Sequence, residues 1–186
     1  MRIIKGKFQR RLIHVPAGLP VRPTTDLAKE SLFNILNNRI DFDNLRAIDL
    51  FAGSGNISYE LISRGCAQVI AVDHTLKCIH FISQTAQLLN MENLQTVRSD
   101  VFRYLSMQKL PYDLIFADPP YDLPEEDYHA LVTLIFEKNL LKEEGNLIIE
   151  HSKGVDFSTH ARFLESRRYG KVHFSFFTLN NSLESE

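Results

Sequence analysis

Two patterns of apolar positions alternate along this chain: short continuous runs, and runs that repeat every three or four residues. The continuous runs predict strands buried on both faces, over residues 47–51, 69–73, 94–98, 112–117 and 145–150. The helical spacing predicts helices over residues 26–38, 57–64, 79–89 and 125–138. This alternation is typical of an α/β fold, in which a mostly parallel sheet carries helices on both faces.

The two ends of the chain depart from this alternation. Residues 2–15 predict a short β-hairpin or ribbon, and residues 162–178 predict an antiparallel hairpin around Arg168-Tyr169-Gly170. We therefore expect a single domain over residues 1–181, in which residues 1–20 form a hairpin extension. A disordered tail is expected over residues 182–186.

The composition is that of an ordinary globular protein, with 186 residues, of which 44% are hydrophobic and 24% charged. No apolar run approaches the roughly 18 residues that a membrane span needs, so we expect no membrane association. The two cysteines, Cys66 and Cys78, form no CxxC motif, which argues against a zinc site and favours reduced thiols in a cytoplasmic protein. No metal is expected, and nothing in the pattern demands a dimer, so we expect a monomer.

Charge is distributed unevenly although the formal net charge is only −2. The first 22 residues contain no acid and six basic residues, namely Arg2, Lys5, Lys7, Arg10, Arg11 and Arg22. Basic residues interleaved with apolar ones are typical of a surface that binds nucleic-acid phosphates. The alternative is a charged edge strand, which proteins use to discourage aggregation.

The first predicted strand leads into a glycine turn, Gly53-Ser54-Gly55, before a helix. Such a turn is typical of a nucleotide-binding site, although Ser58 stands where a dinucleotide fingerprint would have its third glycine. The alternative is a tight turn without a binding role. Asp73 ends the second strand, where an acid can bind ribose hydroxyls, and Asp100 follows the third, where it can accept from an adenine amino group. Asp49 precedes the turn and would attract a cationic ligand, which favours S-adenosylmethionine over a nicotinamide dinucleotide.

The fourth predicted strand ends in Asp118-Pro119-Pro120-Tyr121. Two consecutive prolines cannot donate to a sheet ladder, so the strand stops and Asp118 lies at its carboxyl end. The Asp118 carboxylate and the Pro119 carbonyl can accept both hydrogens of a planar exocyclic amine, while Tyr121 offers a flat face for a base. The alternative is a proline-rich turn with a capping acid.

These features resemble the RsmD family of 16S ribosomal RNA guanine-N2 methyltransferases, within the class I S-adenosylmethionine-dependent methyltransferases. The resemblance is carried by residues 2–8, Arg22-Pro23-Thr24-Thr25-Asp26, residues 49–55 and Asp118-Pro119-Pro120-Tyr121. It implies a Rossmann-like, seven-stranded sheet whose last hairpin inserts an antiparallel strand. It also implies that the partner is 16S ribosomal RNA or the small ribosomal subunit as an assembly intermediate.

The resemblance implies a role for each matching residue. Asp49, Gly53 and Gly55 would hold the methionine end of the cofactor, Asp73 the ribose, and Asp100 with Val101 the adenine, while Phe51 and Ala52 would also contact the cofactor. Residues 118–121 would hold the target amine, with Asp118 also next to the cofactor. Arg22, Thr24 and Asp26 would line the approach, although the residues themselves fit a helix cap equally well. The charge pattern, independently of the resemblance, predicts that Lys5, Lys7, Arg10 and Arg11 bind RNA.

We therefore expect transfer of a methyl group from S-adenosylmethionine to the N2 amine of a guanine in small-subunit ribosomal RNA. A DNA adenine-N6 or cytosine-N4 methyltransferase is the first alternative, because Asp-Pro-Pro-Tyr suits these amines equally. A non-catalytic RNA-binding protein of the same fold is the second, and a nicotinamide oxidoreductase the third.

Overall fold

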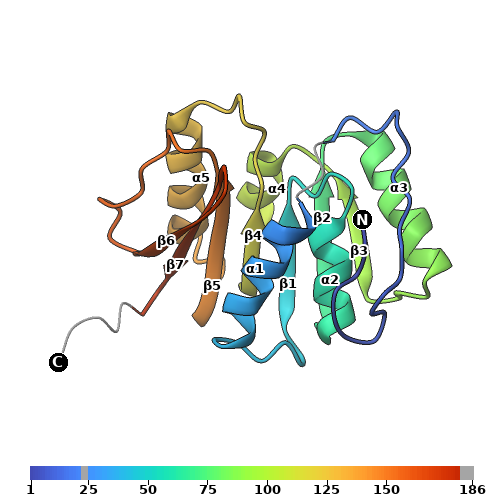
Figure 1. Cartoon of the computed structure of the whole chain (residues 1–186). Helices are drawn as coiled ribbons and strands as arrows, with labels where there is room; N and C mark the ends of the chain where they lie inside the picture. Colours follow the sequence, from blue (N-terminus) through green and yellow to red (C-terminus); the bar gives the residue numbers. More distant parts are fainter. Residues whose placement is uncertain (22–24, 181–186) are drawn as a thin grey trace. The chain divides into compact units, whose positions relative to one another are not determined.

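The computed structural model describes residues 1–21 and 25–180 (Figure 1). Arg22 and Thr24, which the sequence predicts to line the approach to the target, and the tail predicted over 182–186 lie outside the described residues. The strands form one seven-stranded sheet in the order β3-β2-β1-β4-β5-β7-β6. The fold class predicted from the sequence is confirmed.

The elements follow one another in the predicted order, with every predicted strand and helix present. The strands are β1 (Arg46–Leu50), β2 (Gln68–Asp73), β3 (Leu94–Arg98), β4 (Tyr112–Ala117), β5 (Leu141–His151), β6 (Phe163–Tyr169) and β7 (Val172–Thr178). The helices in the described residues are α1 (Asp26–Asn37), α2 (Asn56–Arg64), α3 (Leu76–Leu88), α4 (Val101–Met107) and α5 (Glu125–Glu137). The described residues contain no helix that is long and apolar enough to cross a membrane.

Contacts within the chain define two compact units, Met1–Val101 and Phe102–Glu186. The single domain expected from the sequence therefore stays a prediction. In the first unit β1, β2 and β3 are parallel neighbours, with Leu50 opposite Val72 and Asp73 opposite Arg98. Their carboxyl ends consequently lie along one edge of the sheet.

In the second unit β5 pairs in parallel with β4 and antiparallel with β7, and β6 pairs antiparallel with β7. The hairpin β6–β7 turns at Gly170, whose φ of 65° suits a two-residue connection. Aromatic side chains fill this unit's core, with Phe157 packed edge-on to Phe177 at 5.1 Å between ring centroids. The antiparallel insertion expected from the family resemblance is therefore present.

The N-terminal residues fold back on themselves as the sequence predicts, with Ile3 N–H donating to Arg11 O at 3.0 Å and Ile13 N–H to Met1 O at 2.9 Å. Within residues 1–21 their pairing amounts to one isolated antiparallel bridge, between Arg2 and Leu12. This N-terminal segment, defined here as residues 1–13, is hydrogen-bonded to α2 and is not a free ribbon. Buried Glu60 accepts from Ile4 N–H at 2.8 Å and from Lys5 N–H at 3.1 Å.

A buried ion network lies beneath the N-terminal segment. The Lys29 ammonium from α1 donates to Arg2 O at 2.6 Å and to Asn56 Oδ1 at 2.7 Å, and its nitrogen lies 3.6 Å from Glu60 Oε2. Burial lowers the pKa of Lys29, and the Glu60 carboxylate opposes this effect. Arg64 Nε donates to Glu60 Oε1 at 2.8 Å, and its guanidinium lies over the Phe33 ring. This network joins the N-terminal segment, α1 and α2.

Candidate functional site

Asp49 lies at the end of β1, and its side chain is only 2% exposed. Its Oδ2 accepts two hydrogen bonds from Ser58, one from the backbone N–H at 3.0 Å and one from the hydroxyl at 2.5 Å. Ser58, which replaces the third glycine of a dinucleotide fingerprint, therefore serves to hold this carboxylate. The sequence did not reveal that role.

Burial raises the pKa of Asp49 to about 7; the Ser58 hydrogen bonds lower it, and the charge of Asp73 raises it further. Since an ionised carboxylate is costly to bury alone, the site favours a ligand that brings a positive charge. A sulfonium or an ammonium group meets that requirement, whereas a pyrophosphate does not.

The turn that follows β1 places three residues in the left-handed region, with φ of 61° at Phe51, 55° at Gly53 and 78° at Gly55. A Cβ atom on Gly55 would lie 2.8 Å from Tyr59 Cζ and 2.9 Å from Ile82 Cγ1. Glycine is therefore required at residue 55 both by its backbone conformation and by the space available. Ala52 between them is buried, and its N–H donates to Val72 O at 2.9 Å.

Asp73 ties the end of β2 to the glycine turn. Its Oδ2 accepts from Gly53 N–H at 2.9 Å, and its Oδ1 accepts from Thr75 N–H at 2.7 Å. A carboxylate offers about four acceptor positions, so two remain for ligand hydroxyls. Asp100 follows β3 and is exposed, while Val101 is buried at the start of α4. The first unit thus brings Asp49, Asp73 and Asp100 to the carboxyl ends of three adjacent parallel strands.

In the second unit Asp118 follows β4 and is half-buried, Pro119 is buried, and Tyr121 is 41% exposed. The carbonyl of Pro120 accepts a long hydrogen bond of 3.5 Å from the Tyr128 hydroxyl of α5. Burial raises the pKa of Tyr128 to about 12, with a further contribution from the charge of Asp118. The turn predicted from the sequence is therefore present, with a polar residue and an aromatic ring accessible at the end of β4.

Sequence reasoning missed Glu150, which lies in β5 beside the position of Asp118. The pairing of Ala117 with Ile149 makes Asp118 and Glu150 the next pair in register. Glu150 is 2% exposed, and burial, together with the charge of Asp118, raises its pKa to about 9. The sequence signal that could have revealed Glu150 is an acid at the end of an otherwise apolar strand.

The predicted RNA-binding residues of the N-terminal segment, Lys5, Lys7, Arg10 and Arg11, are all exposed. The Lys7 ammonium lies 5.3 Å from the centroid of the Phe8 ring. Asp26 begins α1, and its carboxylate lies 3.4 Å from Arg2 Nε. This ion pair gives Asp26 a structural role in addition to the contact with substrate that the sequence predicts for it.

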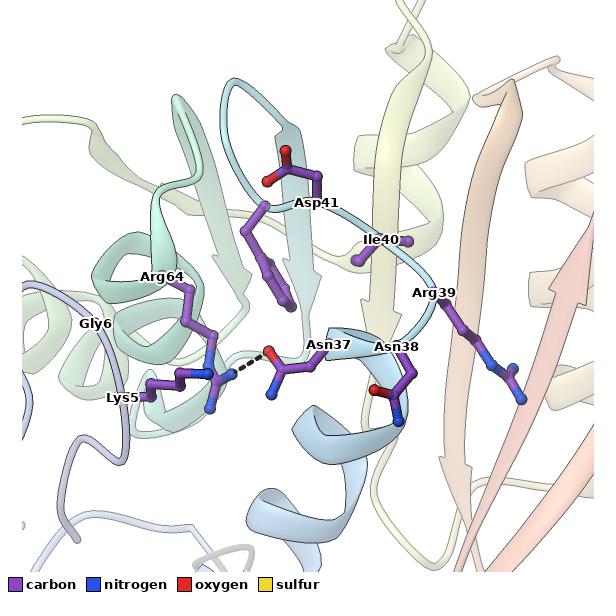
Figure 2. Close-up of a pocket in the computed structure, with 9 residues that line it drawn as sticks. Lys5, Gly6, Asn37, Asn38, Arg39, Ile40, Asp41 and Arg64 are labelled. Carbon is purple, nitrogen blue, oxygen red and sulfur yellow. Dashed lines mark hydrogen bonds between the residues drawn. The ribbon is translucent and has the colours of Figure 1, made fainter.

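A pocket of about 540 Å³ lies at the other end of the first unit, where α1 and α2 finish. In Figure 2 the Arg64 guanidinium lies between Lys5 and Asn37, and it donates to Asn37 Oδ1 at 2.7 Å. The C-termini of α1 and α2 lie at this pocket. The negative ends of their dipoles weaken the attraction that Lys5 and Arg39 exert on an anionic ligand. The pocket therefore stands apart from the acids at the strand ends. No group of three potential metal ligands occurs among residues 1–21 and 25–180.

A family model described as "Conserved hypothetical protein 95" matches residues 1–178. The chain belongs to this family. Within the Conserved hypothetical protein 95 family, a Bacillus subtilis protein named "Putative rRNA methyltransferase YlbH" is 38% identical over 84% of this chain and 85% of its own length. The "Ribosomal RNA small subunit methyltransferase D" of Escherichia coli is 30% identical over 81% of this chain and 74% of its own length.

The same architecture occurs in a solved structure, the "Putative methyltransferase yhhF from Escherichia coli". It superposes with a TM-score of 0.82 at 24% identity and covers 95% of this chain and 96% of its own. At this identity the likeness supports the fold alone. The resemblance stated from sequence motifs is confirmed as membership of a family whose relatives carry ribosomal RNA methyltransferase names.

Proposed function

We propose that this protein transfers a methyl group from S-adenosylmethionine to the exocyclic N2 amine of a guanine in small-subunit ribosomal RNA. The observation that carries the proposal is the Asp118-Pro119-Pro120-Tyr121 turn at the end of β4, in a chain related to a small-subunit ribosomal RNA methyltransferase. A cytoplasmic location fits a ribosomal substrate and the two free cysteines, Cys66 and Cys78.

The first unit holds the cofactor, which is S-adenosylmethionine, as the sequence predicts. Asp49 and the turn residues Phe51, Ala52, Gly53 and Gly55 hold its methionine end, where the buried carboxylate favours positive charge. Asp73 accepts from the ribose hydroxyls, and Asp100 with Val101 contacts the adenine. The hydrogen bonds from Gly53 and Thr75 support this role by fixing the Asp73 carboxylate before any ligand arrives.

The second unit holds the target amine. Asp118 and the Pro119 carbonyl accept its two hydrogens, neither Pro119 nor Pro120 offers a competing N–H, and Tyr121 stacks on the base. The cofactor supplies an electrophilic methyl group, so the protein's task is to align the amine, an effect worth up to about 7–11 kcal/mol. The amine becomes acidic only as the new bond forms, so Asp118 or water then takes its proton.

RNA contacts from the N-terminal segment support this reaction. Lys5, Lys7, Arg10 and Arg11 are exposed and would bind phosphates, and Asp26 at the start of α1 would line the approach to the target. The target base must leave its stack at a cost of a few kcal/mol. Phosphate contacts and stacking on Tyr121 offset that cost.

Asp118→Ala tests the proposal by separating turnover from cofactor binding. We expect kcat with small ribosomal subunits to fall by at least about 10²-fold, as when a group that stabilises the transition state is removed. The cofactor Kd, measured by calorimetry, should stay within about threefold because most cofactor contacts come from the first unit. Asp122→Ala removes an exposed acid from the same loop and should leave both quantities unchanged. An active Asp118→Ala protein would contradict the proposal.

A further inference from the structure

The N-terminal segment follows helix α2 along the length of the helix. At the glycine turn that precedes α2, the Ser54 hydroxyl donates to the Met1 sulfur at 3.6 Å. Near the end of α2, the Ser63 carbonyl accepts from Lys7 N–H at 2.7 Å. Helix α2 has 9 residues, so these two contacts are separated by about 13 Å along its axis, at about 1.5 Å per residue. RNA that follows the exposed cations of the segment is therefore led from the glycine turn to the end of α2.

Two pockets adjoin the segment where it passes the end of α2. The first is the pocket of about 540 Å³ at the ends of α1 and α2, and Lys5 lines it (Figure 2). The second has a volume of about 400 Å³ and is lined by Lys7 and Phe8. Gly6 and Arg64 line both pockets, so the two lie side by side along the Lys5-Gly6-Lys7 stretch.

The charged residues that line the two pockets are mostly basic. The single acid is Asp41, and the cations are Lys5, Lys7, Arg39 and Arg64. Arg64 serves the structure, since its guanidinium donates to Glu60 and Asn37 and its side chain is only 4% exposed. Lys5 and Lys7 are exposed beside the pockets. The linings therefore favour a ligand that carries negative charge, as the phosphates of RNA do.

Asparagine side chains provide most of the uncharged polar groups in the two pockets. They are Asn37 and Asn38 in the first pocket and Asn90 and Asn93 in the second. Asn37 Oδ1 accepts from Arg64 at 2.7 Å, and Asn93 Nδ2 donates to Cys66 O at 2.7 Å. An asparagine amide has two N–H donors and one acceptor oxygen, so the donors of Asn37 and the acceptor of Asn93 remain for a ligand. Such amides suit the edges of bases and the ribose 2′-hydroxyl.

A lone anion is a poor match for these pockets, whereas a nucleotide is a good one. The C-termini of α1 and α2 weaken the attraction for a lone anion. A nucleotide brings, besides its phosphate, a base and a ribose that the asparagine amides can bind. The volumes of about 540 and 400 Å³ lie within the roughly 300–1,000 Å³ that is typical of small-ligand sites. Because the bases of a duplex are already paired, the ligand that fits is single-stranded RNA.

We propose that the two pockets form a second RNA-binding surface, which holds unpaired nucleotides of the RNA whose target base is methylated. This inference rests on the proposed function, because the RNA is the substrate of the proposed reaction. Lys5 and Lys7 bind the phosphates of these nucleotides, and the asparagines hydrogen-bond base edges or ribose hydroxyls. The surface lies at the opposite end of α2 from the glycine turn, so it contributes to RNA affinity and not to the chemical step.

Photo-crosslinking from a single site tests the second surface. The two cysteines of the chain, Cys66 and Cys78, are buried, so a cysteine introduced on the surface can be labelled selectively. Asn38→Cys carries a photoreactive label into the first pocket, and Lys138→Cys carries it to an exposed residue that lines neither pocket. RNA extracted from small ribosomal subunits should crosslink to the label at residue 38, with only background at residue 138. Equal yields at the two residues would overturn the proposal.

Competitors identify the chemistry that the second surface recognises. A single-stranded oligoribonucleotide should prevent the crosslink at residue 38, whereas duplex DNA and inorganic phosphate at the same phosphate concentration should not. If either of the latter prevents the crosslink equally well, the pockets are a general anion site and the proposal is wrong.

A bulky inert label on the same introduced cysteine fills the first pocket and is followed by kinetics. KM for RNA should rise by about tenfold, as for the loss of a contact of about 1.4 kcal/mol, while kcat at saturating RNA stays unchanged. The same label at residue 138 should change neither quantity. An unchanged KM with the label at residue 38 would show that no nucleotide binds in the first pocket.

The outcomes separate this inference from the proposed function. If the label at residue 38 crosslinks to ribosomal RNA but the wild type methylates none, the second surface stands and the proposed function fails. If the wild type methylates RNA but residue 38 gives no more crosslink than residue 138, only the second surface is wrong.

Discussion

At the scale of single residues, burial gives identical side chains different properties. Asp49 is buried and has a pKa raised to about 7, whereas exposed Asp156 has a lowered pKa because Ser158 donates to it. The raised pKa means that protonated Asp49 stabilises the fold below its unfolded pKa of about 4, and that this stability is lost as pH rises through about 7. A cationic ligand reverses the cost by stabilising the ionised form.

Cofactor affinity should therefore depend on pH through Asp49. Between pH 6 and pH 8 the fraction of ionised Asp49 rises about tenfold for a pKa near 7, and affinity for S-adenosylmethionine should rise by up to that factor. Asp49→Asn should remove this contribution, leaving only the titration of the cofactor's own amine. Calorimetric Kd values at both pH values measure the difference between the two proteins. Equal pH dependence in both would contradict the assigned contact with the methionine end.

The residues at the strand ends could be predicted from the sequence, whereas their protonation states could not. Asp49, Asp73, Asp100 and Asp118 were found because each apolar run has a visible end that places a polar residue at the edge of the sheet. Glu150 sits at such an end too, but its place beside Asp118 comes from the parallel pairing of β4 with β5, which the sequence pattern does not reveal.

At the scale of elements, the N-terminal segment is attached to α2 more firmly than its charge suggests. Ser63 donates from its hydroxyl to Lys5 O at 2.6 Å, and its carbonyl accepts from Lys7 N–H at 2.7 Å. Gly6 has a φ of 94°, and a Cβ there would overlap the Ser63 carbonyl. The close approach of the two backbones therefore depends on glycine.

Gly6→Ala should detach the N-terminal segment from α2. We expect a loss of about 1–3 kcal/mol in the free energy of unfolding, measured with urea, because the residue is strained and the segment must move away. RNA affinity should fall as Lys5 and Lys7 lose their fixed positions. Gly18→Ala is the matched control, since a Cβ at Gly18 meets nothing within 4 Å. Equal stabilities for the two variants would show that the attachment contributes little.

Element boundaries show which sequence signals were too weak. Helix α4, Val101–Met107, was missed because seven residues are too few for a clear helical period. Strand β5 begins at Leu141, four residues before the expected start, because Leu141 pairs with Tyr112 although polar Glu143 and Glu144 interrupt the apolar run. In both cases tertiary contact outweighs local pattern.

At the scale of the whole molecule, positive charge is concentrated at the N-terminal end of a chain whose net charge is −2. The structure leaves Lys5, Lys7, Arg10 and Arg11 exposed, while Arg2 pairs with Asp26. An exposed group of cations with few nearby acids raises RNA affinity through the release of counterions, which makes binding depend on salt.

Replacing Lys5, Lys7, Arg10 and Arg11 with alanine should weaken RNA binding and flatten its dependence on salt. If all four residues contact phosphates, the slope of log K against log salt should decrease by about 3–4. Alanine at the exposed Lys109, Lys138, Lys153 and Lys171 of the second unit removes the same charge and serves as the control. If both proteins show the same slope, the N-terminal segment is not an RNA-binding surface.

The seven-stranded sheet and its inserted antiparallel strand were predicted through the resemblance to a family. The order of the strands was not predicted, since alternating strands and helices alone leave it open. Family membership then narrows the chemistry to a methyltransferase of ribosomal RNA. The guanine N2 amine as the target is part of the proposal, because an Asp-Pro-Pro-Tyr turn suits guanine, adenine and cytosine amines alike.

The most direct test is therefore to identify the methylated nucleoside. Labelled S-adenosylmethionine would be incubated with the protein and with small ribosomal subunits from cells that lack its gene, with RNA extracted from those subunits, or with duplex DNA. Nucleosides would then be separated and weighed by mass spectrometry. We predict N2-methylguanosine from the subunits or their RNA and none from DNA. Methylated adenine or cytosine in DNA, with unmodified RNA, would contradict the proposed function.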